Sequence, residues 1–246
     1  MSNVAPYERH LEAILAEAVR LATATADCLD RRVPSCPEWR GRDLVDHLWH
    51  VHTFWQAQLR AADASARRDP GERSIPAGEQ PGDWLEEAAG GLVEALAAVG
   101  PEAACWNWSG QDFDAKWVAR RMALETAVHR FDGELTLGDP TPIATDLAVD
   151  GIDEVLRVHL PTDIADSPEV ALGGTLCLAC SDADDAWIVD VGAGHLRVRE
   201  GSGPASACLR GTASDLYLFT WNRRSVDELE LTGDRSVAAA WATLPT

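Results

Sequence analysis

The stretch that decides the fold is residues 114–135, DAKWVARRMALETAVHRFDGEL. Val118 and Met122 are apolar and share one face of a helix, and Glu125, His129 and Asp132 continue the same stripe at intervals of three or four residues. A bare carboxylate on such a stripe is costly to bury unless it is paired or bound to a metal. The stretch therefore predicts a helix that carries ionisable groups toward a core, and a metal ion would resolve the cost of burying them.

Four more helices are predicted around this one from helical periodicity and from helix start and stop signals. One of them begins at Ser35, because Ser35 and Glu38 have the spacing of a capping box. The polar segment from Arg67 to Gly82 is rich in proline and glycine and is predicted to be a long surface connection. The four predicted helices cover Tyr7 to Arg31, Ser35 to about Ala62, Trp84 to Val99 and Ala144 to Leu160.

The pattern changes from helix to strand at about Pro161. Short β-type runs separated by turn residues follow, and two short helices end the chain. We expect a domain boundary near Ala165, with one domain over residues 1–165 and another over residues 166–246, and hence an α+β fold of two domains. The predicted strands are Val170 to Cys180, Ala186 to Val191, His195 to Glu200 and Ala205 to Arg210, and the helices are Thr212 to Trp221 and Arg235 to Leu244.

The composition limits the classes of partner. The chain has 246 residues and a net charge of −19, from 40 acidic and 21 basic side chains, which repels nucleic acids and anionic lipid surfaces. It has no apolar run of the roughly 18 residues that a membrane span needs. The first ten residues lack a secretory pattern, so we expect a cytoplasmic protein with six reduced cysteines and neither a nucleic-acid nor a membrane partner.

A third candidate ligand comes from the second helix. His47 lies three residues after Leu44 and four before Val51, so it borders the apolar stripe, whereas His50 and His52 are predicted at the surface or its boundary. His47, Glu125 and His129 would form an open set of three ligands, which is typical of catalytic rather than structural zinc. The alternatives are that His47 is an ordinary histidine at the edge of the core, and that Glu125 and His129 form an exposed hydrogen-bonded pair.

Tryptophan is unusually common, with ten residues in the chain. Most are expected in the core, and some are predicted to line an apolar pocket around the metal. These are Trp49, Trp55, Trp106, Trp108 and Trp117.

Several motifs together resemble the mycothiol-dependent maleylpyruvate isomerase family of the DinB-like superfamily. The resemblance covers nearly the whole chain. Its motifs are Ser35-Cys-Pro-Glu-Trp39, Asp43-Leu-Val-Asp-His-Leu48, Glu125-Thr-Ala-Val-His-Arg-Phe-Asp132, Arg210-Gly-Thr-Ala-Ser-Asp-Leu216 and Trp221-Asn-Arg-Arg224. Members of the family often have glycine, tryptophan and then threonine or serine before the second helix, whereas this chain has Glu38-Trp39-Arg40.

The resemblance implies a DinB-like up-and-down four-helix bundle followed by a small sterol-carrier-like α+β domain, in an actinobacterial protein. It implies zinc, or another divalent metal, held by His47, Glu125 and His129, and mycothiol as the thiol cosubstrate. It also implies that Asp132 and an arginine of the second domain act in the active site. Arg223 and Arg224 are the candidates for that arginine, and the sequence does not choose between them.

Three functions remain open at the level of sequence. The first is a metal- and mycothiol-dependent enzyme that isomerises maleylpyruvate-like substrates or transfers the thiol to an electrophile. The second is a metal hydrolase that needs no thiol, and the third is a non-catalytic protein that binds a small ligand. The first two would act on a small molecule, and a monomer and a homodimer are both compatible with the sequence.

Overall fold

The computed structural model describes residues 4–61, 63–71, 75–76, 78–112, 114–166, 169–192 and 194–244. The chain divides into two compact units, Ala5–Thr141 and Pro142–Thr246. The first is helical and the second contains a five-stranded sheet, which confirms the predicted α+β class. No helix in the described ranges combines the length and the hydropathy that crossing a membrane requires.

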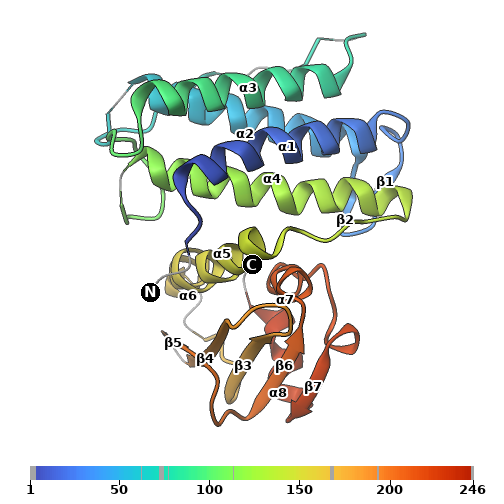
Figure 1. Cartoon of the computed structure of the whole chain (residues 1–246), viewed down its shortest axis with the longest axis vertical. Coiled ribbons are helices and arrows are strands. Elements are labelled where there is room, and N and C mark those ends of the chain that lie inside the picture. Colours follow the sequence, from blue (N-terminus) through green and yellow to red (C-terminus); the bar gives the residue numbers. More distant parts are fainter. Residues whose placement is uncertain are drawn as a thin grey trace. The chain divides into compact units, whose positions relative to one another are not determined.

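The first unit is a bundle of four helices that lie side by side (Figure 1). Helix α1 packs against α3 and α4, and α2 packs against α3. The four helices are α1 (Tyr7–Thr25), α2 (Gly41–Ala61), α3 (Pro81–Val99) and α4 (Ala115–Leu137).

Helix α4 is the central element of the bundle. Its start is capped by Asp114, whose carboxylate accepts a hydrogen bond from the backbone N–H of Trp117 at 2.8 Å. Its end is set by Gly138, whose left-handed φ of 85° suits glycine. Between these ends α4 is buried on nearly every side, and the buried residues include Arg121, His129 and Arg130. Charged side chains on a helix that is buried on every side are stable only where oppositely charged or hydrogen-bonding partners surround them.

The predicted start of the second helix at Ser35 was wrong. Residues before Gly41 form a hairpin of β1 (Arg32–Val33) and β2 (Cys36–Arg40). A Cβ at Gly41 would lie 2.7 Å from the carbonyl oxygen of Cys28, so glycine permits the close approach at which α2 begins. The predicted end at Ala62 lies outside the described residues.

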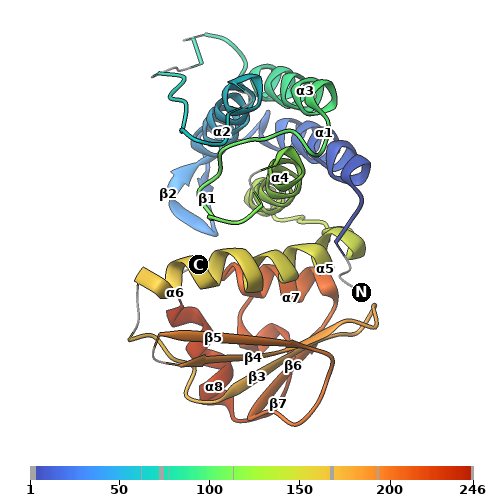
Figure 2. The same cartoon turned by 90° about the vertical axis from the view of Figure 1, so that its left-hand side faces the viewer.

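The second unit is built on a mixed sheet with the strand order β5-β4-β3-β6-β7 (Figure 2). Strands β3 and β6 are parallel, and the other neighbours are antiparallel. The four predicted strands are present, and the short polar strand β7 was missed. The strands are β3 (Thr175–Cys180), β4 (Ala186–Gly192), β5 (His195–Glu200), β6 (Ala207–Gly211) and β7 (Glu230–Gly233).

Helix α5 belongs to this second unit. It packs against α7, and a Cβ at Gly151 would lie 2.4 Å from Cζ of Tyr217. The helix predicted from Ala144 to Leu160 therefore buries its apolar face on the sheet unit, and the division falls before Pro142 rather than near Ala165. The helical segments are α5 (Thr145–Glu154), the π-helical η1 (Val155–His159), α6 (Leu160–Asp166), α7 (Ala213–Thr220), η2 (Val226–Glu228), α8 (Arg235–Ala239) and η3 (Ala240–Thr243).

Candidate metal centre

Three predicted ligands meet inside the bundle, where the second turn of α2 faces α4. His47 comes from α2, and Glu125 and His129 come from successive turns of α4. Nε2 of His47 lies 3.2 Å from Oε1 of Glu125, and Nε2 of His129 lies 3.4 Å from the same oxygen. One ligand atom from each residue lies within 4.8 Å of the other two. Among the described residues this is the one histidine, cysteine and carboxylate cluster with that spacing.

The geometry fits a divalent metal of the zinc type. Donors bound at about 2.0–2.1 Å in a tetrahedral arrangement are about 3.3–3.5 Å apart, which is close to the two separations measured from Oε1 of Glu125. Two imidazoles and one carboxylate leave room for a further ligand. The side chains of His47 and Glu125 are 32% and 22% exposed, so solvent and a small ligand can reach the donors.

Asp132 supports the cluster from behind. Its side chain is fully buried, and its Oδ2 accepts a hydrogen bond from Nδ1 of His129 at 2.9 Å. The hydroxyl of Ser35 donates to Oδ1 of Asp132 at 2.5 Å, and the thiol of Cys36 donates to Oδ2 at 3.9 Å. The β1–β2 hairpin thus holds the carboxylate that orients His129, and Nε2 of His129 is left to face Glu125. A carboxylate behind a ligating histidine is a common arrangement in metal sites.

The cluster perturbs two titrations in opposite directions. Burial disfavours the charge on Glu125, but the nearby Arg121 guanidinium and hydrogen bonds from His129 and His47 hold the pKa of that carboxyl well below its usual range. Burial also disfavours protonation of His129, yet its bonds to Asp132 and Glu125 raise the pKa of His129 to about 9. The lowered pKa keeps Glu125 ionised, whereas the raised pKa of His129 means that its imidazole must release a proton before Nε2 can bind a metal.

Sequence reasoning missed Arg121 and Trp39. Arg121 lies one turn before Glu125 on α4, and its Nη2 is 2.6 Å from Oε2 of Glu125. Its i,i+4 spacing from Glu125 was a signal that could have found it. The indole of Trp39 lies 4.9 Å from the ring of His47 and 5.9 Å from that of His129, between centroids. No local pattern predicts Trp39, because the hairpin brings it there.

The five tryptophans predicted around the metal have other ring partners. Trp55, Trp106, Trp108 and Trp117 pack together, at centroid separations of 5.4 to 6.3 Å. Trp49 packs edge-to-face on Trp84 at 6.0 Å. Trp39, which was not among them, contacts the rings of both His47 and His129.

One of the neighbouring histidines differs from its prediction. His52 is fully buried rather than at the surface or its boundary, and its Nε2 lies 3.0 Å from the hydroxyl of Thr126. His50 is half-buried and pairs with Asp46 at 3.3 Å, which agrees with its predicted boundary position.

Arg223 and Arg224 lie in the second unit, after α7. The guanidinium of Arg224 donates to Asp215 and Glu228, each at 3.1 Å. Nη1 of Arg223 donates to the backbone carbonyl of Trp221 at 2.8 Å. Arg224 is thus committed to two carboxylates of its own unit, and Arg223 contacts a carbonyl.

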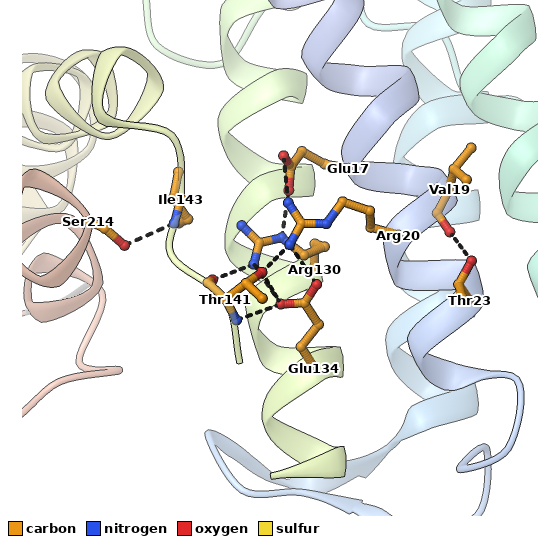
Figure 3. Close-up of polar contacts among 9 residues, drawn as sticks. All are labelled: Glu17, Val19, Arg20, Thr23, Arg130, Glu134, Thr141, Ile143 and Ser214. Carbon is orange, nitrogen blue, oxygen red and sulfur yellow. Dashed lines mark hydrogen bonds and ion pairs between the residues drawn. The ribbon is translucent and has the colours of Figure 1, made fainter. Parts of the chain in front are cut away.

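A second buried charge network is centred on Arg130 of α4 (Figure 3). Arg130 is fully buried, and its guanidinium donates to Glu17 of α1 at 2.6 Å and to Glu134 at 2.8 Å. It also donates to the carbonyl of Thr141 at 2.6 Å. This network joins α1 to α4 one residue after His129, so it fixes the helix that carries two of the three donors.

The fold and the cluster define a class of protein: two-unit chains with a His–Glu–His cluster inside a four-helix bundle. Comparison with known proteins identifies the family. The family model for the mycothiol maleylpyruvate isomerase N-terminal domain matches residues 9–133, and the model for the corresponding C-terminal domain matches residues 146–240. The chain belongs to the mycothiol-dependent maleylpyruvate isomerase family.

A solved structure shares the fold. It is a crystal structure of a histidine-to-alanine mutant of the mycothiol-dependent maleylpyruvate isomerase, with a TM-score of 0.61 and 12% sequence identity over 93% of each chain. No curated protein matches the sequence.

Proposed function

We propose that this protein is a mycothiol-dependent isomerase that acts on maleylpyruvate or a similar cis-enedioate with the help of one divalent metal, most simply zinc. The observation that carries the proposal is the open triangle of His47, Glu125 and His129, with Asp132 behind His129. Membership of the family and the shared fold support the same reaction class.

His47, Glu125 and His129 would hold the metal. A zinc ion bound there would supply an acid strong enough to keep a thiol cosubstrate deprotonated at neutral pH. Because Nδ1 of His129 is hydrogen-bonded to Asp132, His129 would use Nε2 for the metal once that nitrogen has lost its proton. Ser35 and Cys36 keep Asp132 in place, and Trp39 covers one side of both imidazole rings.

The isomerisation needs an addition and an elimination. The thiol sulfur forms a bond to one alkene carbon, and the electron pair of the double bond moves onto the conjugated carbonyl as an enolate. The former double bond is now single and rotates. The enolate pair then re-forms the double bond and expels the sulfur, so the trans isomer leaves and the thiol is regenerated. An arginine of the second unit, Arg223 or Arg224, would hold the substrate carboxylates through paired hydrogen bonds.

Metal content is the first test. We expect about one zinc per chain in the purified protein, and loss of that zinc in Glu125→Ala and His47→Ala. His50→Ala is the matched control, since His50 lies one turn along the same helix and pairs with Asp46 instead. A wild-type protein that neither contains nor takes up a divalent metal would rule out the proposed centre.

The reaction itself is tested with and without mycothiol. We expect conversion of maleylpyruvate to its trans isomer only when mycothiol is present, with the thiol recovered unchanged. A stable thioether product would indicate an S-transferase instead, and hydrolysis of the substrate without any thiol would favour the hydrolase alternative.

The arginine is tested by two parallel variants. We expect one of Arg223→Gln and Arg224→Gln to raise the KM for the dicarboxylate substrate by about tenfold or more, as loss of a charge-assisted pair implies, with metal content unchanged. An unchanged KM in both variants would remove the second unit's arginines from the proposal.

A further inference from the structure

The two oxygens of Glu125 have different partners. Oε1 faces the two imidazoles, at 3.2 Å from His47 and 3.4 Å from His129. Oε2 faces Arg121, whose Nη2 is 2.6 Å away. The Arg121 side chain is only 3% exposed, so its charge is held in the protein interior next to the cluster. Because Arg121 holds Oε2, Glu125 can offer only Oε1 to a metal.

The charged groups in the donor contacts described above can be summed. Glu125 and Asp132 contribute two negative charges, Arg121 contributes one positive charge, and His47 and His129 are neutral when they act as ligands. The sum for these four side chains and Arg121 is −1. A divalent cation at the donors brings the sum to +1, and one monoanion as the remaining ligand brings it to zero.

We propose that Arg121 is a specificity-determining residue of this centre, which makes the metal-loaded site select a monoanionic ligand, such as a deprotonated thiol, over a neutral one. The inference rests on the proposed function, because it requires the metal. Without Arg121 the loaded site would already be neutral, and an anionic ligand would leave a net negative charge in a partly buried place.

Arg121 is close enough to act on such a ligand. It is separated from the donors by a single carboxylate group, and Glu125 is only 22% exposed. For unit charges about 6 Å apart at an effective dielectric constant of about 20, the interaction is large enough to change an affinity by about tenfold or more. The electrostatic interaction of Arg121 with a neutral ligand is much weaker.

Two probes separate charge selection from simple support of the site. Cobalt-substituted protein is titrated with azide, a monoanion, and with imidazole, a neutral ligand, and binding is followed by visible absorbance. In Arg121→Gln we expect the azide Kd to rise by about tenfold or more and the imidazole Kd to change by less than about threefold. Arg121→Lys, which keeps the charge, should retain azide binding.

The control is Arg120→Gln, on the preceding and partly exposed position of α4, which should leave both Kd values unchanged. Circular dichroism verifies that each variant is folded. If Arg121→Gln is not, Arg121→Met, which fills the same buried space with an apolar chain, takes its place with the same expectation.

Equal weakening of azide and imidazole binding would show that Arg121 only supports the site, and it would overturn the inference. Unchanged azide binding in Arg121→Gln would overturn it as well. A wild-type protein that takes up no cobalt or zinc would instead refute the proposed function, and the inference would fall with it.

Discussion

At the scale of single residues, Asp132 has the clearest predicted effect. Asp132→Asn replaces the carboxylate that accepts the Nδ1–H of His129, so both the tautomer and the orientation of the imidazole are less well defined. We expect metal affinity to fall by about 10- to 100-fold, as is typical when the partner of a ligating histidine is changed. Competition with a chromophoric chelator measures this effect.

Ser35→Ala is the graded companion to that change. It removes one hydrogen bond to Asp132 and leaves the carboxylate in place, so it should weaken metal binding less than Asp132→Asn does. Equal affinity in wild type and Asp132→Asn would show that Asp132 does not orient the ligand.

The buried side chain of His52 should make the free energy of unfolding depend on pH. Burial lowers the pKa of His52 from 6.5 to about 4. Below pH 6.5 the unfolded chain binds a proton that the folded chain does not bind until about pH 4. The contribution to stability is therefore complete above pH 6.5 and is lost as the pH falls toward 4, by about 3 kcal/mol.

Urea unfolding at intervals between pH 7 and 4.5 measures this slope. His52→Gln should flatten the slope, because the titrating group is gone. A variant that retains the full wild-type slope would assign the acid sensitivity to other groups.

The grouping of Glu125, His129 and His47 was predictable at this scale, because helical spacing alone places Glu125 and His129 on one face and His47 at the edge of another helix's stripe. Arg121 follows the same rule and was overlooked. Trp39 and Ser35 were not predictable as parts of the site, since a hairpin brings them to α4 from about 90 residues away in sequence.

At the scale of elements, the contact between α1 and α4 depends on a glycine. A Cβ at Gly133 would lie 2.3 Å from Cδ1 of Leu21, which is fully buried. Gly133→Ala should therefore force the helices or Leu21 to shift, at a cost of about 1–3 kcal/mol. Thermal or urea unfolding measures the change.

Gly90 in α3 is the matched control, because a Cβ there meets nothing within 4 Å. Gly90→Ala should stabilise the protein by about 0.5–1 kcal/mol through helix propensity. The idea of close packing at Gly133 would be refuted if both substitutions changed the unfolding free energy in the same direction.

Element boundaries show where local signals compete with tertiary contacts. The ends of α3 and α4 were predicted to within three residues, because glycine and a capping aspartate mark them. The start of α2 was not predicted correctly. Ser35 has the sequence of a helix cap, but its hydroxyl donates a hydrogen bond to Asp132 instead. Helix α5 was recognised as a helix, but periodicity does not say which unit its apolar face covers.

At the scale of the whole molecule, buried ion pairs hold the first unit together around Arg130. Arg130→Met would remove the buried guanidinium from Glu17 and Glu134 and leave them only Arg20, whose side chain is 40% exposed, and we expect a loss of about 3 kcal/mol. Arg157→Met is the control, because Arg157 forms similar pairs with Asp153 and Glu200 but its side chain is 40% exposed. It should cost less than about 1 kcal/mol.

Comparable losses in the two variants would show that burial does not set the value of these pairs. Denaturant unfolding of the full chain makes the comparison, with fluorescence and circular dichroism as independent probes.

The division of the chain leads to one more prediction. All three donors and Asp132 lie in Ala5–Thr141, so a fragment with these bounds should fold and bind one metal ion. It should not isomerise substrate if an arginine of the second unit is needed. Metal analysis and circular dichroism of the fragment test the first point, and a fragment that folds but binds no metal would contradict it.

The position of Trp39 has a consequence for observation. Its indole lies within 6 Å of both imidazoles, between ring centroids, so it is close enough for a paramagnetic ion at the donors to quench its emission. Trp39 should therefore serve as an intrinsic fluorescent reporter of metal binding at the cluster. The difference in quenching between the wild type and Trp39→Phe would report filling of the site in real time, without an added dye.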